Sequence, residues 1–171
     1  MGDTTAIGNA GEHFVMAELL ARGLQAFRAD RSNTAYDLAV FSGEKHSLIR
    51  VKTSTSENLQ WSAKKTGEIF LKMKKSADYV AIVIFKSRQN PIRSAQVYIV
   101  PTIVVDREIR KCHTFWLAHS GEKQLARSAS LHRGLILSGS ATATNLGRGY
   151  ANKWKRYLEA WHQLGAPSWV E

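Results

Sequence analysis

Three charged residues, Asp37, Arg50 and Lys52, lie in a stretch that is patterned as a β-hairpin. Residues 36–41 and 46–53 are rich in β-forming side chains, and a polar segment with a glycine separates them, which is typical of two strands and a turn. Successive side chains point to opposite faces of a strand, so Arg50 and Lys52 share a face. A turn centred between the strands pairs residues whose numbers sum to 87, which places Asp37 opposite Arg50. A carboxylate and a lysine at the mouth of a hairpin suggest a site for a divalent metal ion and a phosphate.

This hairpin resembles that of the PD-(D/E)XK nuclease superfamily, to which restriction endonucleases, homing endonucleases and Holliday-junction resolvases belong. The more similar branch reads Tyr-Asp-Leu in one strand and Val-Gln-Val-Lys-Thr in the next. The matching stretches here are Tyr36-Asp37-Leu38 and Ile49-Arg50-Val51-Lys52-Thr53. The resemblance extends over about residues 8–101, because residues 78–85 and 95–101 are similar to a buried strand and a strand ending in proline in that branch.

The resemblance implies a magnesium site, which manganese could also occupy. Asp37 would be the central ligand, Glu12 a second ligand, and the backbone carbonyl of Val51 a third. Lys52 would orient or deprotonate the attacking water and stabilise the phosphate. The alternative for Asp37 and Lys52 is a cross-strand surface ion pair, which contributes at most about 1 kcal/mol.

Arg50 departs from the family pattern, which has Gln or Glu at this position. An arginine has no acceptor atom and keeps its charge, so it cannot be a metal ligand. Opposite Asp37 it could form a bidentate pair that weakens cation binding, or supply the charge of the missing ion. It could also turn outward to a DNA phosphate while another acid takes its place. The available acids are Glu57 and Glu68, and Glu68 is better placed because a helix after the lysine strand can cross over the site.

Residues 7–22 are predicted to form the helix that positions Glu12. Thr4 or Thr5 can cap its start and Gly23 can end it. Glu12 falls on the same stripe as Val15, Met16 and Leu19, so its carboxylate either reaches solvent at the edge or is held inward. The resemblance implies the second arrangement, since the family has Gly-Glu in its first helix.

Further elements follow in the order expected of an α/β fold. We expect a strand at 24–30, the hairpin, a second helix at 61–75, buried strands at 78–85 and 95–100, a helix at 102–117 and a last helix at 151–164; residues 120–144 show no clear pattern. This gives a restriction-endonuclease-like αβββαβ core with a central mixed sheet flanked by helices. The sequence predicts one domain over residues 1–171, with its core at about 7–101 and a basic, mainly helical extension at about 102–171.

The charge distribution indicates a polyanionic partner. The chain of 171 residues has 24 Lys and Arg against 14 Asp and Glu, and 19 of those cations follow residue 50. Neutralised phosphates release counterions and drive binding, so we expect DNA, duplex or branched, as the partner. The alternative is a basic surface that only aids solubility. The residues expected to bind nucleic acid are Arg50, Lys64, Lys65, Lys72, Lys74, Lys75, Arg148 and Lys153.

Other classes of protein are disfavoured. No stretch is long and apolar enough for a membrane span, no signal peptide is evident, and the one cysteine, Cys112, gives neither a disulfide nor a zinc motif. The six histidines lack ligand spacing. We therefore expect a cytoplasmic, metal-dependent endonuclease. A homodimer is compatible with this activity, since cutting both strands usually needs two active sites. The alternative is a nuclease-fold protein that binds nucleic acid but has lost efficient cleavage through Arg50.

Overall fold

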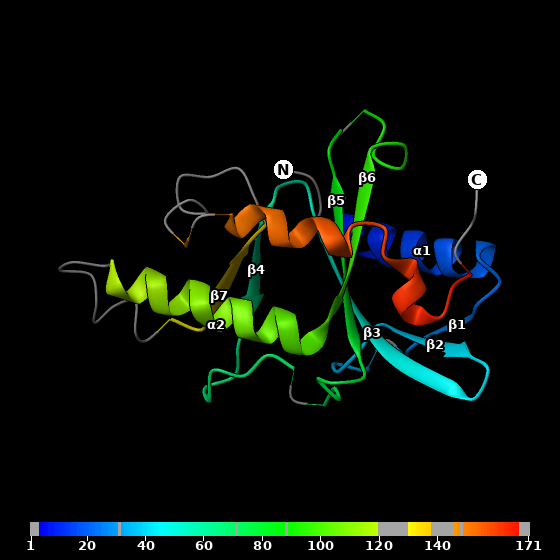
Figure 1. Cartoon of the computed structure of the whole chain (residues 1–171), viewed down its shortest axis with the longest axis horizontal. Helices are drawn as coiled ribbons and strands as arrows, with labels where there is room; N and C mark the ends of the chain where they lie inside the picture. Colours follow the sequence, from blue (N-terminus) through cyan, green and yellow to red (C-terminus); the bar gives the residue numbers. More distant parts are fainter. Residues whose placement is uncertain are drawn as a thin grey trace.

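The computed structural model describes residues 4–30, 32–70, 72–87, 89–119, 130–137, 146–147 and 149–167. At its centre is a five-stranded mixed sheet in the order β1-β2-β3-β5-β6, beside a separate two-stranded sheet of β4 and β7 (Figure 1). The elements are α1 (Thr4–Ala21), β1 (Gln25–Arg28), β2 (Leu38–Ser42), β3 (Lys45–Ser54), β4 (Asn58–Ser62), β5 (Tyr79–Phe85), β6 (Ala95–Pro101), α2 (Thr102–Ala118), β7 (His132–Ile136) and the 3-10 helices η2 (Tyr150–Tyr157) and η3 (Trp161–Leu164). The predicted mixed α/β architecture, with a central sheet flanked by helices, is confirmed. No helix in the described part of the chain has the length and apolar character needed to cross a membrane.

Strand β5 divides the core into two layers because it is buried on both faces, as its apolar sequence predicts. Val80, Ile82 and Ile84 face a cluster formed with α2, β4, β7 and η2. Ala81 and Val83 face the other cluster, which includes α1 and η3. The helix predicted at 102–117 is confirmed as α2, and α1 matches the helix predicted at 7–22.

The hairpin of β2 and β3 has the predicted register. Leu38 pairs with Ile49 and Ser42 pairs with Lys45, and both sums are 87. Gly43 occupies the turn with a φ of 60°, which an L residue rarely adopts. The β3 strand then pairs in parallel with β5, while the other pairs in this sheet are antiparallel. The cation-bearing strand is therefore held from both sides.

The prediction of a second helix at residues 61–75 is wrong. Leu59 and Trp61 are buried in alternation on β4, and Leu59 pairs with Leu135 of β7. Residues 63–70 and 72–78 then form turns and irregular segments, and one turn is closed by hydrogen bonds between Lys64 and both Gly67 and Glu68. Phe70 and Met73 pack in the same core cluster as Leu59 and Trp61. The segment begins as a strand because β4 pairs with β7, which lies some seventy residues later in the chain.

The last predicted helix, at 151–164, is two short 3-10 helices with a break between them. Glu159 has a φ of 51° at the break. Its backbone N–H donates to the carbonyl of Val97, and its carboxylate accepts from the N–H of Val97, so the break docks on the edge strand β6. Trp154 and Trp161 are buried and belong to the core.

Candidate active site

Helix α1 lies directly against β3 at Gly11. A Cβ at Gly11 would overlap Oγ1 of Thr53 and lie 2.9 Å from its Cβ. The Thr53 hydroxyl is buried and has no hydrogen-bond partner among the described residues. The contact is therefore made by shape alone, and it brings the next residue, Glu12, to the open end of the hairpin.

The side chain of Asp37 accepts the last hydrogen bond between the two strands of the hairpin. Its Oδ2 accepts a hydrogen bond of 2.7 Å from the N–H of Val51, and its own N–H donates to the carbonyl of Ile49 at 2.9 Å. The carboxylate thus occupies the place where the backbone of a continued β2 would have paired. The acid sits where the two strands separate, as the sequence predicts.

Glu12 and Asp37 line one polar cleft of about 360 Å³. An ion pair of 2.8 Å joins Oε2 of Glu12 to Nη2 of Arg28, and Nη1 of Arg28 lies 3.2 Å from Nε2 of His13. Arg28 also lines the cleft, as do Asn9 and Tyr36. The cleft is therefore lined by three carboxylates, those of Glu12, Asp30 and Asp37, and the carboxylate of Glu12 is already paired with a guanidinium group.

Electrostatic surroundings shift two ionisable groups in opposite directions. Burial raises the pKa of Asp37, and the nearby carboxylate of Glu12 raises it further, against the Val51 N–H and the charges of Arg50 and Arg28. Burial lowers the pKa of Lys52, and the charge of Arg50 lowers it further. Groups whose pKa is shifted by burial and by neighbouring charges occur often at functional sites, so both residues are candidates for one.

Arg50 is bonded to the backbone of the segment that precedes β2. Its Nη1 donates to the backbone carbonyls of Thr34 at 2.6 Å and Ala35 at 3.3 Å, and no ion pair with Asp37 forms in the described structure. Its charge still acts on both Asp37 and Lys52. Arg50 therefore anchors the segment that leads into β2. The Asp37 carboxylate is bonded to the N–H of Val51 and not to Arg50.

A replacement acid does not complete the site. Glu57 is paired with Lys86. The backbone carbonyl of Glu68 closes the turn that begins at Lys64. Among the described residues, no group of three or more His, Cys, Asp or Glu side chains is arranged to hold a metal ion, so neither acid forms a triad with Glu12 and Asp37.

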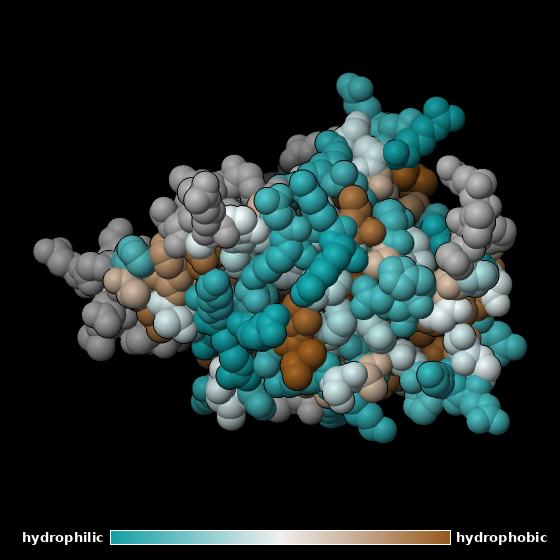
Figure 2. All heavy atoms as spheres, viewed as in Figure 1, coloured by the Kyte–Doolittle hydropathy of each residue, from teal (hydrophilic) through white to brown (hydrophobic). Residues whose placement is uncertain are grey.

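The basic residues predicted to contact nucleic acid occupy several places. Lys64, Lys65, Lys72 and Lys74 are exposed in the segment between β4 and β5, along the lower edge of Figure 1. Lys75 pairs with Asp106. Lys153 pairs with Glu108 and lies 3.8 Å from the ring centre of Tyr150. Arg148 lies outside the described residues. Figure 2 shows hydrophilic residues over much of the face in view.

Sequence reasoning missed Arg28 and Trp61. Arg28 ends β1 and pairs with Leu38, the neighbour of Asp37; its place at the end of the strand before the hairpin is the available signal. Trp61 lies beneath Lys52, whose Nζ is 5.3 Å from the ring centre. The predicted helix concealed this contact, because it placed the tryptophan on a different element.

The fold is similar to those of solved structures of nucleases. No family model and no curated protein matches the chain. Among solved structures, the bacterial homing endonuclease I-Ssp6803I is similar over 95% of this chain and 91% of its own, with 14% identity and a TM-score of 0.50. The Holliday junction resolvase Hjc of Archaeoglobus fulgidus matches 56% of this chain and 73% of its own, with 20% identity and a TM-score of 0.42. The chain therefore shares its fold with a homing endonuclease.

Proposed function

We propose that this protein is a metal-dependent endonuclease that hydrolyses phosphodiester bonds in DNA. The observation that carries the proposal is the meeting of Glu12 and Asp37 in one cleft, with the Asp37 carboxylate bonded to the strand that bears Lys52. The fold shared with a homing endonuclease and the net charge of +10 support it. Hydrolysis of this kind needs a bound cation, an oriented water and neutralisation of charge on the phosphate.

The donor set fits magnesium, with manganese as an alternative. Magnesium usually binds one or two carboxylates and keeps several waters, which matches Asp37 and Glu12, and the backbone carbonyl of Val51 would be the third protein ligand. When bound, the ion would polarise the phosphate and activate water. Arg28 competes for Glu12 in the described structure.

Lys52 would accept the proton of the attacking water. Its lowered pKa increases the neutral fraction near neutral pH, so Nζ can accept a proton from the attacking water. The resulting hydroxide adds to phosphorus as the bond to the leaving oxygen breaks, and that oxygen takes a proton from solvent. The exposed lysines between β4 and β5 would bind the phosphate backbone of duplex or branched DNA. Two copies acting as a homodimer would cut both strands.

Arg28→Met should tighten binding of manganese to the protein alone by about fivefold. The substitution frees Glu12 and removes a positive charge that also acts on Asp37. A partly exposed ion pair contributes about 1 kcal/mol, which is about fivefold in affinity. Isothermal titration with Mn²⁺ in the absence of DNA measures the change.

Arg22→Met is the matched control for Arg28→Met. Arg22 also pairs with a glutamate of α1, Glu18, which is not part of the cleft. The control removes the same charge and the same type of pair, so it should leave manganese affinity within a factor of about two. Equal affinities in the two variants would show that Arg28 does not limit the site.

A second function, DNA binding without efficient cleavage, is favoured by one observation. The charge of Arg50 acts on both Asp37 and Lys52, where an uncharged or acidic residue would favour a cation. Supercoiled plasmid separates the two functions when the native chain is incubated with it in magnesium and then in manganese. Nicking or linearisation by the native chain supports the nuclease.

Arg50→Gln should lower the magnesium concentration needed for half-maximal cleavage by about threefold to tenfold, because a positive charge leaves the site. It should also move the rise of cleavage rate with pH to higher pH, since the charge of Arg50 contributes to the lowered pKa of Lys52. Plasmid cleavage measured across magnesium concentration and pH gives both values. If the variant cleaves plasmid and the native chain does not, the protein is a nuclease inhibited by Arg50. If neither cleaves plasmid but both bind DNA, the binding function remains.

A further inference from the structure

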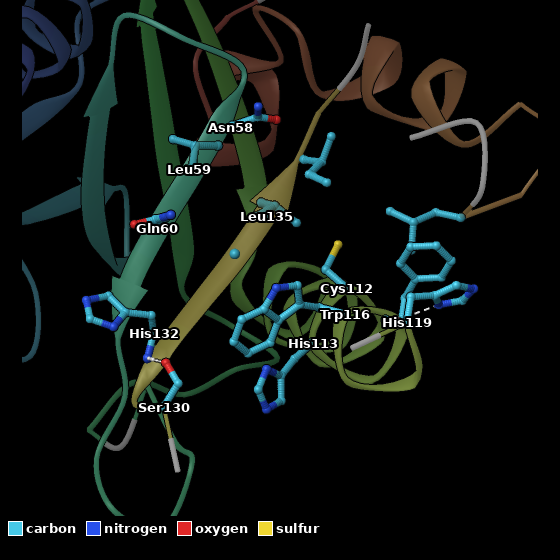
Figure 3. A pocket seen from close by; sticks show the side chains of 14 residues that line it. Asn58, Leu59, Gln60, Cys112, His113, Trp116, His119, Ser130, His132 and Leu135 are labelled. Carbon is cyan, nitrogen blue, oxygen red and sulfur yellow. Dashed lines mark hydrogen bonds between the residues drawn. The ribbon is translucent and has the colours of Figure 1, made fainter. Parts of the chain in front are cut away.

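A second cavity, of about 580 Å³, lies between α2 and the β4–β7 sheet, away from the acidic cleft (Figure 3). Its volume is in the range of small-molecule sites in proteins. None of its lining residues carries a carboxylate. This cavity shares no lining residue with the cleft of Glu12 and Asp37, and it has no part in the proposed hydrolysis.

The floor of the cavity is flat because of Gly134. On the face of the sheet where Asn58 and Gln60 are exposed, Gly134 pairs with Gln60 and contributes no side chain. A Cβ at Gly134 would make only an ordinary contact, 3.8 Å from the carbonyl of Leu59. Because Gly134 has no side chain, a planar group could lie against the sheet next to Gln60.

Aromatic rings of α2 form the wall. The rings of Trp116 and His113 lie 5.7 Å apart at 34°, and in Figure 3 both rings lie beside β7. Trp116 is 37% exposed, whereas Trp61, Trp154 and Trp161 are buried. Burial and the charge of Arg133 lower the pKa of His113, which favours a neutral ring that offers one donor and one acceptor.

Arg133 does not line the cavity, but it is bonded to two residues that do. Nη1 of Arg133 donates to the carbonyls of Ser130 at 2.7 Å and His132 at 3.0 Å. Nη2 of Arg133 would lie 3.5 Å from a Cβ at Gly67, so the turn that carries Lys64 and Lys65 adjoins it. A ligand in the cavity would therefore have positive charge nearby, beside the lining residues Ser130 and His132.

We propose that this cavity binds a single nucleobase, either of an unpaired DNA segment or of a free nucleotide. Aromatic side chains stack on every base and amides bond to base edges, which are the groups that Trp116, Asn58 and Gln60 supply. A base enters such a cavity only when it is unstacked. The part of the proposal that concerns DNA rests on the proposed function, because it supplies that enzyme with a preference for strands with unpaired bases.

The cavity is connected to the candidate active site through two side chains. Trp61, which lies beneath Lys52, pairs across the small sheet with Arg133. Arg133 in turn acts on His113 in the wall of the cavity.

Fluorescence anisotropy in EDTA, which prevents cleavage, tests the proposal with two labelled single-stranded oligonucleotides of equal length. One carries ordinary bases, and the other carries abasic sites at most positions and hence the same phosphates. The native chain should bind the first about tenfold more tightly, equivalent to about 1.4 kcal/mol. Gly134→Leu, which fills the floor, and Trp116→Ala, which removes the wall, should each abolish this difference. Lys64→Ala should weaken both oligonucleotides equally, because it removes a phosphate contact.

Equal binding of the two oligonucleotides by the native chain, or a tenfold preference retained in both cavity variants with unchanged melting temperatures, would overturn the proposal. Quenching of tryptophan fluorescence by deoxyadenosine monophosphate, lost in Trp116→Ala, would identify a free nucleotide as a ligand; preference for the intact strand without such quenching would identify a base within DNA. If the protein cleaves plasmid but shows no preference for intact bases, the base-binding proposal fails and the nuclease proposal stands. If it prefers intact bases but does not cleave, the nuclease proposal fails and the base-binding proposal stands.

Discussion

Asp37→Asn and Lys52→Met should each reduce magnesium-dependent cleavage by a factor of about 10³. Asp37 is the proposed central ligand of the ion, and Lys52 is the proposed proton acceptor, so each variant removes a group that acts on the reacting atoms. Both side chains keep nearly their native shape, and neither lies among the exposed lysines between β4 and β5. DNA binding measured in EDTA should therefore stay within a few-fold of native while plasmid cleavage is lost.

Asp37→Asn should also stabilise the fold at neutral pH. The pKa of Asp37 is raised mainly by burial, so the folded chain binds this proton more tightly than the unfolded chain does. The stabilisation linked to that proton is full below the unfolded pKa and is lost as pH rises through the raised pKa. Asparagine stays uncharged at every pH, so its melting temperature should exceed that of the native chain by a few degrees at pH 7, and the difference should fade toward pH 4.

Asp78→Asn is the control that separates an active-site carboxylate from a structural one. Asp78 is buried, and its two oxygens accept hydrogen bonds from the backbone N–H groups of Leu48 and Lys74. Asparagine keeps only one acceptor, so this variant should lower the melting temperature. A destabilised Asp37→Asn, or one that still cleaves plasmid at the native rate, would remove Asp37 from the proposed site.

The hairpin and the buried β5 could be predicted because their signals are local. Gly43 fixes the turn, the turn fixes the register, and the register places Asp37 where the structure has it. The apolar run at 79–85 similarly admits few structures other than a strand buried on both faces. In each case the residues of the element and its turn are sufficient to predict its structure.

The parts that sequence reasoning missed depend on distant segments. Strand β4 exists because β7 pairs with it, and no pattern within residues 58–75 indicates that partner. The Arg28–Glu12 pair likewise depends on how close α1 lies to the sheet. The carboxylate of Glu12 could be placed inward only by resemblance, since its stripe on the helix is equally compatible with the solvent edge.

Gly11→Ala should destabilise the fold by about 1–3 kcal/mol, although alanine usually stabilises a helix. The gain from helix propensity is about 1 kcal/mol, but the new methyl group would overlap the Thr53 hydroxyl, and overpacking of this kind costs more than propensity returns. The helix must move away from β3, and Glu12 moves with it, so cleavage should fall together with stability. Urea unfolding and the plasmid assay measure the two losses.

Gly8→Ala and a double variant determine whether the clash is the cause. Gly8 lies on the same helix with no atom near its missing Cβ, so Gly8→Ala should stabilise the chain by up to about 1 kcal/mol and leave cleavage unchanged. Adding Thr53→Ala to Gly11→Ala removes the overlapping hydroxyl and should recover part of both losses, with a coupling energy of about 1 kcal/mol. Independent effects of the two substitutions would mean that α1 does not rest on Thr53. If cleavage recovers with stability, the approach of α1 to β3 at Gly11 is what positions Glu12 beside Asp37, and the glycine belongs to the site as much as the acid that follows it.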